Sequence, residues 1–260
     1  CLTAALLERN LCRTRKALIG LGRRQHRAIR ISPVIPKTVY TRSGETDKPD
    51  IPRYPAKMEA LTMKICIDPG HSGKIEPGAC AGGVTEAAIN LEVAKIAGRM
   101  LEKFGHQVLL TRSGEVDNDW LSWRCEAAWA FDADIFVSIH CNACEDEQAK
   151  GTEVFYFPGS ETGHALASCI QSEVVALCRT VDRKVKTNNE WTVLTETAMP
   201  AVLVELAFIT NDAERAKLTS GMGQRQFAEG IVKGINRFAD GGPLFGKVME
   251  SPALYSVRSA

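Results

Sequence analysis

The chain has 260 residues, of which 45% are hydrophobic and 24% charged, a composition typical of globular proteins. No run of 18 or more uninterrupted apolar residues occurs, so we expect no transmembrane segment. Residues 1–63 carry 13 Lys/Arg against 5 Asp/Glu, whereas residues 64–238 carry 17 against 24. The acidic main region argues against nucleic acid as a partner, because proteins that bind nucleic acids present a basic face.

The first 62 residues differ from the rest in charge and pattern. Residues 6–30 form an arginine-rich stretch with leucines at helical spacing, and residues 35–54 combine prolines with Ser, Thr, Gly and Asp, as linkers do. No signal-peptide hydrophobic region with a cleavage site can be read here. We expect residues 1–62 to be poorly ordered and unnecessary for the chemistry. The alternative is that this basic segment contacts an anionic surface such as a membrane or wall polymer.

The nine cysteines are scattered, and several lie within apolar runs. Such cysteines behave as small hydrophobic residues, so we expect reduced thiols from a cytoplasmic site of synthesis and no disulfide framework. Cys141 and Cys144, next to His140, have the spacing of half a zinc knuckle. No second Cys-x-x-Cys completes it, which favours a structural role for both residues.

Taken in chain order, the first predicted element is a short buried strand over residues 64–67, with Ile65 and Ile67 on one face. The Asp-Pro-Gly sequence that follows ends the strand, because proline cannot donate to a sheet and glycine lets the chain turn. His71 is thereby left on a loop at the carboxyl end of the strand, where open α/β sheets place their ligands. A histidine in this position can ligate a metal, act as a base or cap a turn.

A glycine- and alanine-rich loop, residues 72–83, separates His71 from a predicted helix. The loop lacks a Walker lysine and Rossmann spacing, so it is a weak candidate for phosphate binding. Thr85 fits the N-cap of the helix, which we expect to run from Glu86 to about Phe104. An acid in a first turn usually complements the helix dipole. Because this helix directly follows the loop, Glu86 can also turn toward His71.

The middle of the chain predicts two further strands with a helix between them. Residues 107–111 read as a strand, with Arg112 at its end, and residues 121–131 read as a helix. Residues 134–140 form an almost continuous apolar run, which fits a central strand buried on both faces. This run ends in His140, so two strands each deliver a histidine at their carboxyl ends. That coincidence is much stronger evidence for a site than either histidine alone.

The last third predicts strands over residues 152–157, 191–194 and 200–211, and helices over residues 163–177, 212–218 and 224–238. Glu205 lies inside the apolar strand, where an ionised carboxylate is costly unless a partner or a metal receives it. Pairing with Arg112 or Arg124 is the structural alternative; a lone acid in a core strand favours a functional role. The folded domain therefore spans residues 63–239, and we expect a poorly ordered tail over residues 240–260.

Several motifs in this order resemble the zinc-dependent N-acetylmuramoyl-L-alanine amidases of the family-3 type, which cut bacterial peptidoglycan. The resemblance covers about residues 63–238. The motifs that carry it are Ile67-Asp-Pro-Gly-His-Ser-Gly73, Glu86 with Asn90-Leu91, Leu110-Thr-Arg112, Leu121 with Arg124, Phe136-Val-Ser-Ile-His-Cys-Asn-Ala143 and Met199-Pro-Ala-Val-Leu-Val-Glu-Leu-Ala-Phe-Ile-Thr-Asn211.

The resemblance implies an α/β fold with a mostly parallel, six-stranded twisted sheet flanked by helices on both faces. It also implies one zinc ion per chain, with His71, Glu86 and His140 as its ligands and Glu205 as the catalytic acid/base. Two imidazoles and one carboxylate leave a fourth zinc position for water, as catalytic zinc sites do. Asp68 and Asn142 are candidates to orient the ligand histidines, with turn capping as the alternative, and Arg112 is a candidate substrate contact.

The sequence departs from the family pattern after the first histidine. Relatives usually carry Gly-Gly-x-Asp-Pro-Gly-Ala there, whereas this chain has Ser72-Gly-Lys-Ile-Glu-Pro-Gly-Ala79. Thr195 stands where an arginine is frequent, and Leu206 replaces a frequent threonine. Some relatives active in cell division insert a long helix after the second histidine that blocks the zinc. Only residues 144–151 are available here, so we expect a constitutively open site.

The expected reaction is hydrolysis of the amide bond between N-acetylmuramic acid and L-alanine, by a monomeric enzyme whose partner is peptidoglycan. Such an enzyme is made in the cytoplasm and acts on the cell wall, either as a phage-type endolysin or as an exported bacterial hydrolase. Two alternatives stay open. One is a catalytically inactive relative that binds the wall or regulates another hydrolase, and the other is a zinc peptidase that cuts wall peptides.

Overall fold

The computed structural model describes residues 62–116 and 120–241, so the predictions for residues 1–61 and for the tail beyond residue 241 lie outside the described residues. The strands are β1 (Lys64–Pro69), β2 (Cys80–Ala81), β3 (Val84–Thr85), β4 (Gln107–Leu110), β5 (Ile135–Asn142), β6 (Thr152–Tyr156), β7 (Asp182–Thr187) and β8 (Ala201–Phe208). The helices are α2 (Glu86–Lys103), α3 (Leu121–Phe131), α4 (Glu161–Cys178), α5 (Thr192–Thr195), α6 (Asp212–Thr219) and α7 (Gly221–Ala239).

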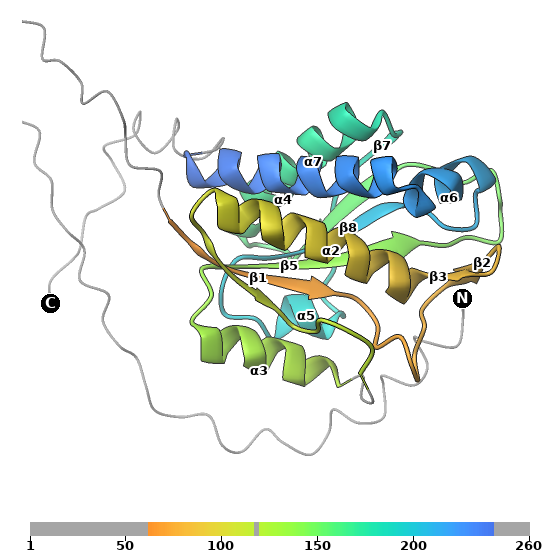
Figure 1. Cartoon of the computed structure of the whole chain (residues 1–260). Coiled ribbons are helices and arrows are strands. Elements are labelled where there is room, and N and C mark those ends of the chain that lie inside the picture. Colours follow the sequence, from red (N-terminus) through yellow and green to blue (C-terminus); the bar gives the residue numbers. More distant parts are fainter. Residues whose placement is uncertain (1–61, 117–119, 242–260) are drawn as a thin grey trace, which may run out of the picture. The chain divides into compact units, whose positions relative to one another are not determined.

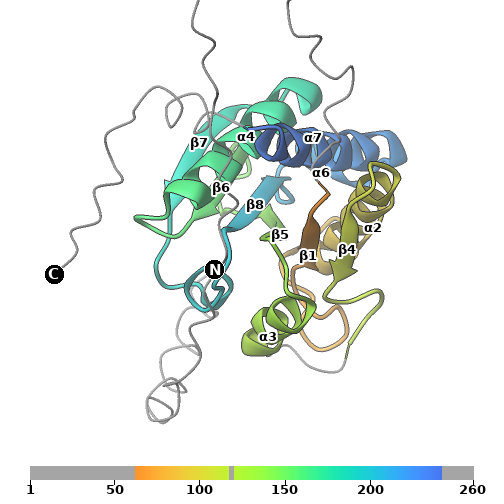
Figure 2. The same cartoon turned by 90° about the vertical axis from the view of Figure 1, so that its left-hand side faces the viewer.

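Six of these strands form one twisted sheet (Figure 1). Their order is β4-β1-β5-β8-β6-β7, as Figure 2 shows. The first four run parallel, β6 is antiparallel to β8, and β7 is parallel to β6. The predicted α/β fold with a mostly parallel six-stranded sheet is confirmed. The short β2–β3 hairpin lies apart from the sheet, within the glycine-rich loop that precedes α2.

Helices cover both faces of the sheet, as expected, but unequally (Figure 2). On one side, which we call the α7 face, helices α2, α4 and α7 pack on alternate strand residues such as Ile67, Val137 and Val204, all completely buried. On the other side, the α3 face, helix α3 and the single turn α5 pack on Cys66, Phe136 and their neighbours in a smaller cluster. Side chains alternate between the faces along each strand.

Two glycines let α7 approach α4 closely. A Cβ atom at Gly234 would lie 2.5 Å from the Cα of Ile170, and one at Gly230 would lie 2.8 Å from the Cα of Val174. Real Cβ atoms do not approach a backbone so closely, so both positions require glycine if the helices are to keep this separation.

One prediction for the region after α4 is wrong, and one strand there was not predicted. Residues 191–194 were expected to form a strand, but Thr192–Thr195 form the helical turn α5, which begins where the side chain of Asn188 accepts hydrogen bonds from the amides of Glu190 and Trp191. The true strand in this region is β7, at the edge of the sheet. Its sequence, Asp-Arg-Lys-Val-Lys-Thr, lacks the apolar alternation of a buried strand, because edge strands carry charged side chains.

Two further observations concern the helices. The connection from β5 to β6, residues 143–151, contains no helix. Among the helices of the described residues, none combines the length and the apolar character that crossing a membrane requires.

Candidate metal centre

His71 is placed by a tight turn after β1. The amide of Gly70 donates to the carbonyl oxygen of Ile139 on β5, 2.9 Å away, which holds the end of β1 against its neighbour. A Cβ atom at Gly70 would lie 2.3 Å from the ring of His140, so only glycine leaves room for that imidazole. His71 itself has a φ of +64°, a left-handed conformation that a non-glycine residue rarely adopts. The Asp-Pro-Gly-His sequence therefore aims one imidazole across the end of the sheet toward the other.

Glu86 is the first residue of α2, as predicted. The side chain of Thr85 caps the helix by accepting from the amide of Ala88. The Glu86 carboxylate is buried and turned into the molecule, where the backbone amides of Ala79 and Cys141 donate to it at 3.0 and 2.9 Å. Its place in the first turn thus serves more than the helix dipole, since two other segments of the chain hold it in position.

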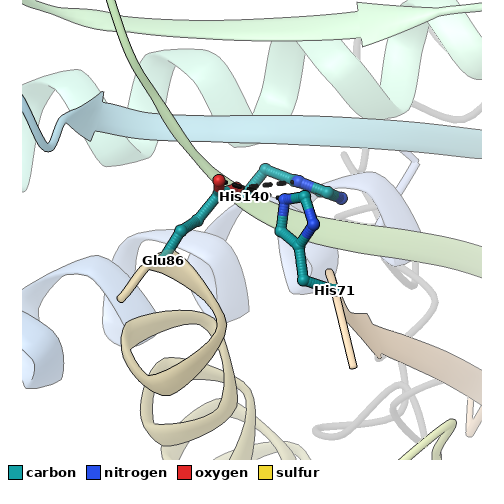
Figure 3. Close-up of side chains that lie close together, drawn as sticks. All are labelled: His71, Glu86 and His140. Atoms are coloured by element: carbon teal, nitrogen blue, oxygen red, sulfur yellow. Dashed lines mark hydrogen bonds and ion pairs between the residues drawn. The ribbon is translucent and has the colours of Figure 1, made fainter. Parts of the chain in front are cut away.

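These three side chains converge (Figure 3). Oε1 of Glu86 lies 2.9 Å from Nδ1 of His140, and its Oε2 lies 3.0 Å from Nε2 of His71. The centroids of the imidazole rings are 4.9 Å apart. The ligand atoms of the three residues all lie within 4.8 Å of one another. The three elements that supply them are a loop, a helix start and a central strand.

The donor set fits a divalent metal such as zinc. Two imidazole nitrogens and one carboxylate oxygen are the ligands that catalytic zinc takes, with one position left for water. A Cβ atom at Gly78 would lie 2.5 Å from the ring of His71 and 2.7 Å from Glu86, so the chain keeps this flank of the cluster clear. Burial alone would lower the pKa of His71, but hydrogen bonds to the carboxylates of Glu76 and Glu86 raise it to about 10. The cluster therefore attracts positive charge, which a proton or a metal ion can supply.

Glu76 is a member of the site that sequence reasoning missed. Its Oε2 contacts Nδ1 of His71, and its Oε1 accepts from the amide of Gly78 at 3.2 Å. A closed turn brings it there, because the amides of Ser72 and Gly73 both donate to the Glu76 carbonyl oxygen. The hydrogen bond with His71 is the main cause that lowers the pKa of Glu76. A carboxylate on the second ring nitrogen is how metal-binding histidines are usually oriented.

Glu205 lies on β8 directly beside His140, its register partner on β5. Its Oε2 is buried, and within the described part of the chain no group donates a hydrogen bond to it. Burial first, and then the charges of Glu86 and Glu153, raise the pKa of Glu205 well above its ordinary value. The structural alternative of an ion pair with Arg112 or Arg124 is absent among the described contacts. An acid with a raised pKa is better able to hold a proton and then give it up than an ordinary surface carboxyl group.

The two arginines hold the loop that carries His71. Arg112 donates to the carbonyl oxygens of Pro69, Gly70 and Ala87 at 2.8–3.0 Å. Arg124 donates to the carbonyl oxygens of Pro69 and His71, both at 2.9 Å. Arg112, a candidate substrate contact, is buried and is directed at the backbone.

Asp68 and Asn142, the candidates to orient the histidines, have other described partners. Asp68 accepts from Arg124 at 2.6 Å and from the hydroxyls of Thr111 and Ser138. Burial opposes ionisation of Asp68, but the charge of Arg124 and these hydrogen bonds lower its pKa. Asn142 donates to Glu153 at 2.7 Å and accepts from its neighbour's amide. Neither side chain has a described hydrogen bond to an imidazole.

Two cysteines, Cys141 and Cys144, follow His140 closely in the sequence. Cys141 is buried in the core of the α7 face, where its thiol donates to Asn90 at 3.4 Å, and burial raises its pKa well above the ordinary value. All seven cysteines in the described residues are free thiols, and neither Cys141 nor Cys144 belongs to the metal-ligand cluster.

Comparison with known proteins places this geometry in a family. A family model described as N-acetylmuramoyl-L-alanine amidase matches residues 65–237. The chain is 39% identical to the uncharacterised protein YqiI of Bacillus subtilis (strain 168), over 68% of this chain and 84% of YqiI. It is 36% identical to the N-acetylmuramoyl-L-alanine amidase LytC of the same organism, over 65% of this chain but only 34% of LytC.

A solved structure of a relative has a similar fold. The catalytic domain of CwlV, an N-acetylmuramoyl-L-alanine amidase from Bacillus (Paenibacillus) polymyxa var. colistinus, superposes with a TM-score of 0.65 at 31% identity, covering 69% of this chain and 99% of that domain. The predicted resemblance is confirmed, and this chain belongs to the N-acetylmuramoyl-L-alanine amidase family.

Proposed function

We propose that this chain hydrolyses the amide bond between the lactyl group of N-acetylmuramic acid and L-alanine in peptidoglycan. In this proposal His71, Glu86 and His140 hold one zinc ion, and Glu205 is the catalytic acid/base. Membership of the amidase family supports the reaction. The observation that carries the residue roles is the convergence of the three ligand side chains beside a buried carboxylate whose Oε2 has no described hydrogen-bond partner.

When bound, zinc supplies Lewis acidity toward the amide carbonyl and lowers the pKa of water toward about 7. The protein's own part is proton transfer and positioning. Glu205 accepts a proton from the attacking water and delivers it to the departing amine of L-alanine. Its raised pKa suits both steps, because burial and the neighbouring carboxylates favour the protonated form that delivers the proton.

Other residues keep the reacting groups aligned. Glu76 holds the proton on Nδ1 of His71, so that Nε2 stays available as a ligand atom. Asp68 acts through Arg124, whose guanidinium joins the Asp68 carboxylate to the carbonyl oxygen of His71. Arg112 holds the same loop from its other side. We expect these contacts to limit the movement of His71 between turnovers.

The proposal is tested with dye-labelled cell walls, in the presence and absence of a chelator, followed by mass spectrometry of the soluble products. We expect chelator-sensitive release of dye and new amino-terminal L-alanine. An inactive wall-binding relative would release nothing, and a zinc peptidase would cut between amino acids and leave the lactyl amide intact.

We also propose that residues 63–239 are the catalytic unit of a monomeric, constitutively open enzyme that acts on the cell wall. The family match over residues 65–237 and the helix-free connection over residues 143–151 support this division. In this proposal the basic segment before residue 63 makes at most a surface contact with an anionic polymer. A chain that begins at Met63 is then expected to retain the activity of the full chain on isolated walls.

A further inference from the structure

The row of polar side chains on the α3 face continues beyond Glu205 to the edge of the sheet. Glu153 on β6 is the antiparallel register partner of Glu205, which puts both side chains on the same face about 5 Å apart. Glu153 is buried, and three donors surround it. Nζ of Lys186 and Nε of Arg183, both from β7, lie 2.5 and 2.8 Å from its Oε2, while Asn142 donates to Oε1.

The two cations are held in place rather than loose on the surface. The guanidinium of Arg183 lies 4.9 Å from the ring of Phe208, and its aliphatic stem packs where a Cβ atom at Gly151 would lie 2.9 Å away. Nζ of Lys186 lies 5.8 Å from the ring of Phe155. Both side chains remain about one-third exposed, at 35% and 40%.

Glu153 uses only part of the positive charge and of the hydrogen-bond donors of Arg183 and Lys186. Two cations face one carboxylate, so this cluster carries a net charge of +1. In the described part of the chain, Arg183 uses Nε for a hydrogen bond and its two terminal nitrogens for none, and Lys186 spends one of three donors on Glu153. A buried acid that fixes two partly exposed cations leaves their remaining donors available to an incoming anion.

We propose that Arg183 and Lys186 form a carboxylate-binding subsite for the stem peptide on the leaving side of the scissile amide. The group that it would take is the free α-carboxyl of the residue after L-alanine, a D-glutamate that is joined to the next residue through its side chain. This inference rests on the proposed function and names the part of the substrate that the site selects.

The layout of the sheet supports the assignment. Along the order β5-β8-β6-β7, the metal-ligand cluster comes first, the acid/base Glu205 next and the two cations last. In this proposal Glu205 protonates the leaving amine, and the stem peptide extends from β8 toward β6 and β7. From that amine nitrogen to the α-carboxyl of the next residue is about 6 Å along the chain. The Lys186 ammonium is bound to Glu153, whose strand β6 lies one strand spacing, roughly 5 Å, from β8.

The test uses two soluble disaccharide-tripeptide substrates with lysine as third residue, which differ only in whether the α-carboxyl of D-glutamate is free or amidated. With the full zinc-loaded chain, we expect kcat/KM to be about tenfold higher for the free acid, since one charge-assisted contact is lost with the amide. Lys186→Met and Arg183→Met should each reduce this preference to near one, mainly through KM for the acid substrate. The matched control is Lys184→Met, because Lys184 lies on the same strand, is 77% exposed and pairs with Asp182.

Equal kcat/KM values for the two substrates in the unmodified chain would overturn the proposal, and this comparison does not depend on any variant folding. A preference that survives both Lys186→Met and Arg183→Met would overturn it as well. If the unmodified chain cleaves neither substrate, the proposed function fails and the subsite fails with it.

Discussion

The two faces of the sheet are built from alternate residues of the same strands, yet they have different roles. On the α7 face, Val202, Val204 and Leu206 of β8 are completely buried under three helices. On the α3 face, the intervening Glu205 is an acid, and the neighbouring strands add His140 and Glu153. One face therefore supplies the apolar burial that stabilises the fold, and the other can carry buried charges that a core would not accept.

This division makes function and stability separable by mutation, and Glu205→Gln should separate them most strongly. We expect wall hydrolysis to fall about 10³-fold, because the side-chain amide of glutamine cannot accept the proton from water. Metal content, measured by mass spectrometry on the purified chain, should stay near that of the unmodified chain, and thermal stability should not fall, because a buried carboxyl without a described partner has been replaced. Hydrolysis within a few-fold of the original rate would remove Glu205 from the mechanism.

The α3 face also contains a charge pair that supports folding, so it is not purely catalytic. Asp68→Asn should cost roughly 3 kcal/mol in urea unfolding of the metal-free chain, because it breaks the buried ion pair between Asp68 and Arg124.

The pH dependence of this cost follows from the lowered pKa of Asp68 in the folded state. The carboxylate contribution is complete above the unfolded pKa of about 3.9 and is lost as the pH falls through the folded value. The stability difference between the two chains should thus be constant from neutral to mildly acidic pH and shrink below about pH 4. A difference that grows on acidification would contradict the assignment.

The α7 face should respond to a change that leaves the chemistry untouched. Gly234→Ala places a Cβ atom 2.5 Å from the backbone of Ile170, so α7 must move away from α4. We expect a loss of about 2 kcal/mol in chemical unfolding. The activity of each folded molecule should be unchanged. Titration with a tight metal chelator gives the concentration of metal-loaded sites, to which the measured activity is normalised. A large fall in activity per folded molecule would show that the two faces are coupled.

The smallest effect is expected at the position that sequence reasoning overlooked. Glu76→Gln keeps the shape of the side chain but removes the charge that holds His71 through Nδ1. Zinc affinity, measured by competition with a chromogenic chelator, should weaken about tenfold, as for other carboxylates that orient a metal-binding histidine. Ser72→Ala is a suitable control in the same turn, because the hydrogen bonds described for its hydroxyl are to the backbone of Glu76. Equal affinities for Glu76→Gln and the unmodified chain would contradict the orienting role.

How far the sequence predicts this molecule depends on where each signal lies. Continuous apolar runs predict β5 and β8, and the capping residue Thr85 predicts the start of α2 and hence the position of Glu86. The edge strand β7 escapes prediction because its charged residues lack a buried pattern, and with it the cations beside Glu153. Glu76 escapes because its contact with His71 arises only when the loop closes on itself. The strand predicted over residues 191–194 is wrong because apolar residues can pack against the sheet equally well from one helical turn.

The central claim is that His71, Glu86 and His140 hold a single divalent ion beside Glu205. It is tested most directly by anomalous diffraction at the zinc edge from crystals of the zinc-loaded chain. The account predicts one strong anomalous peak within bonding distance of these three side chains, on the side that faces β8. A peak bound elsewhere, or a zinc-loaded chain in which the three side chains point apart, would contradict it.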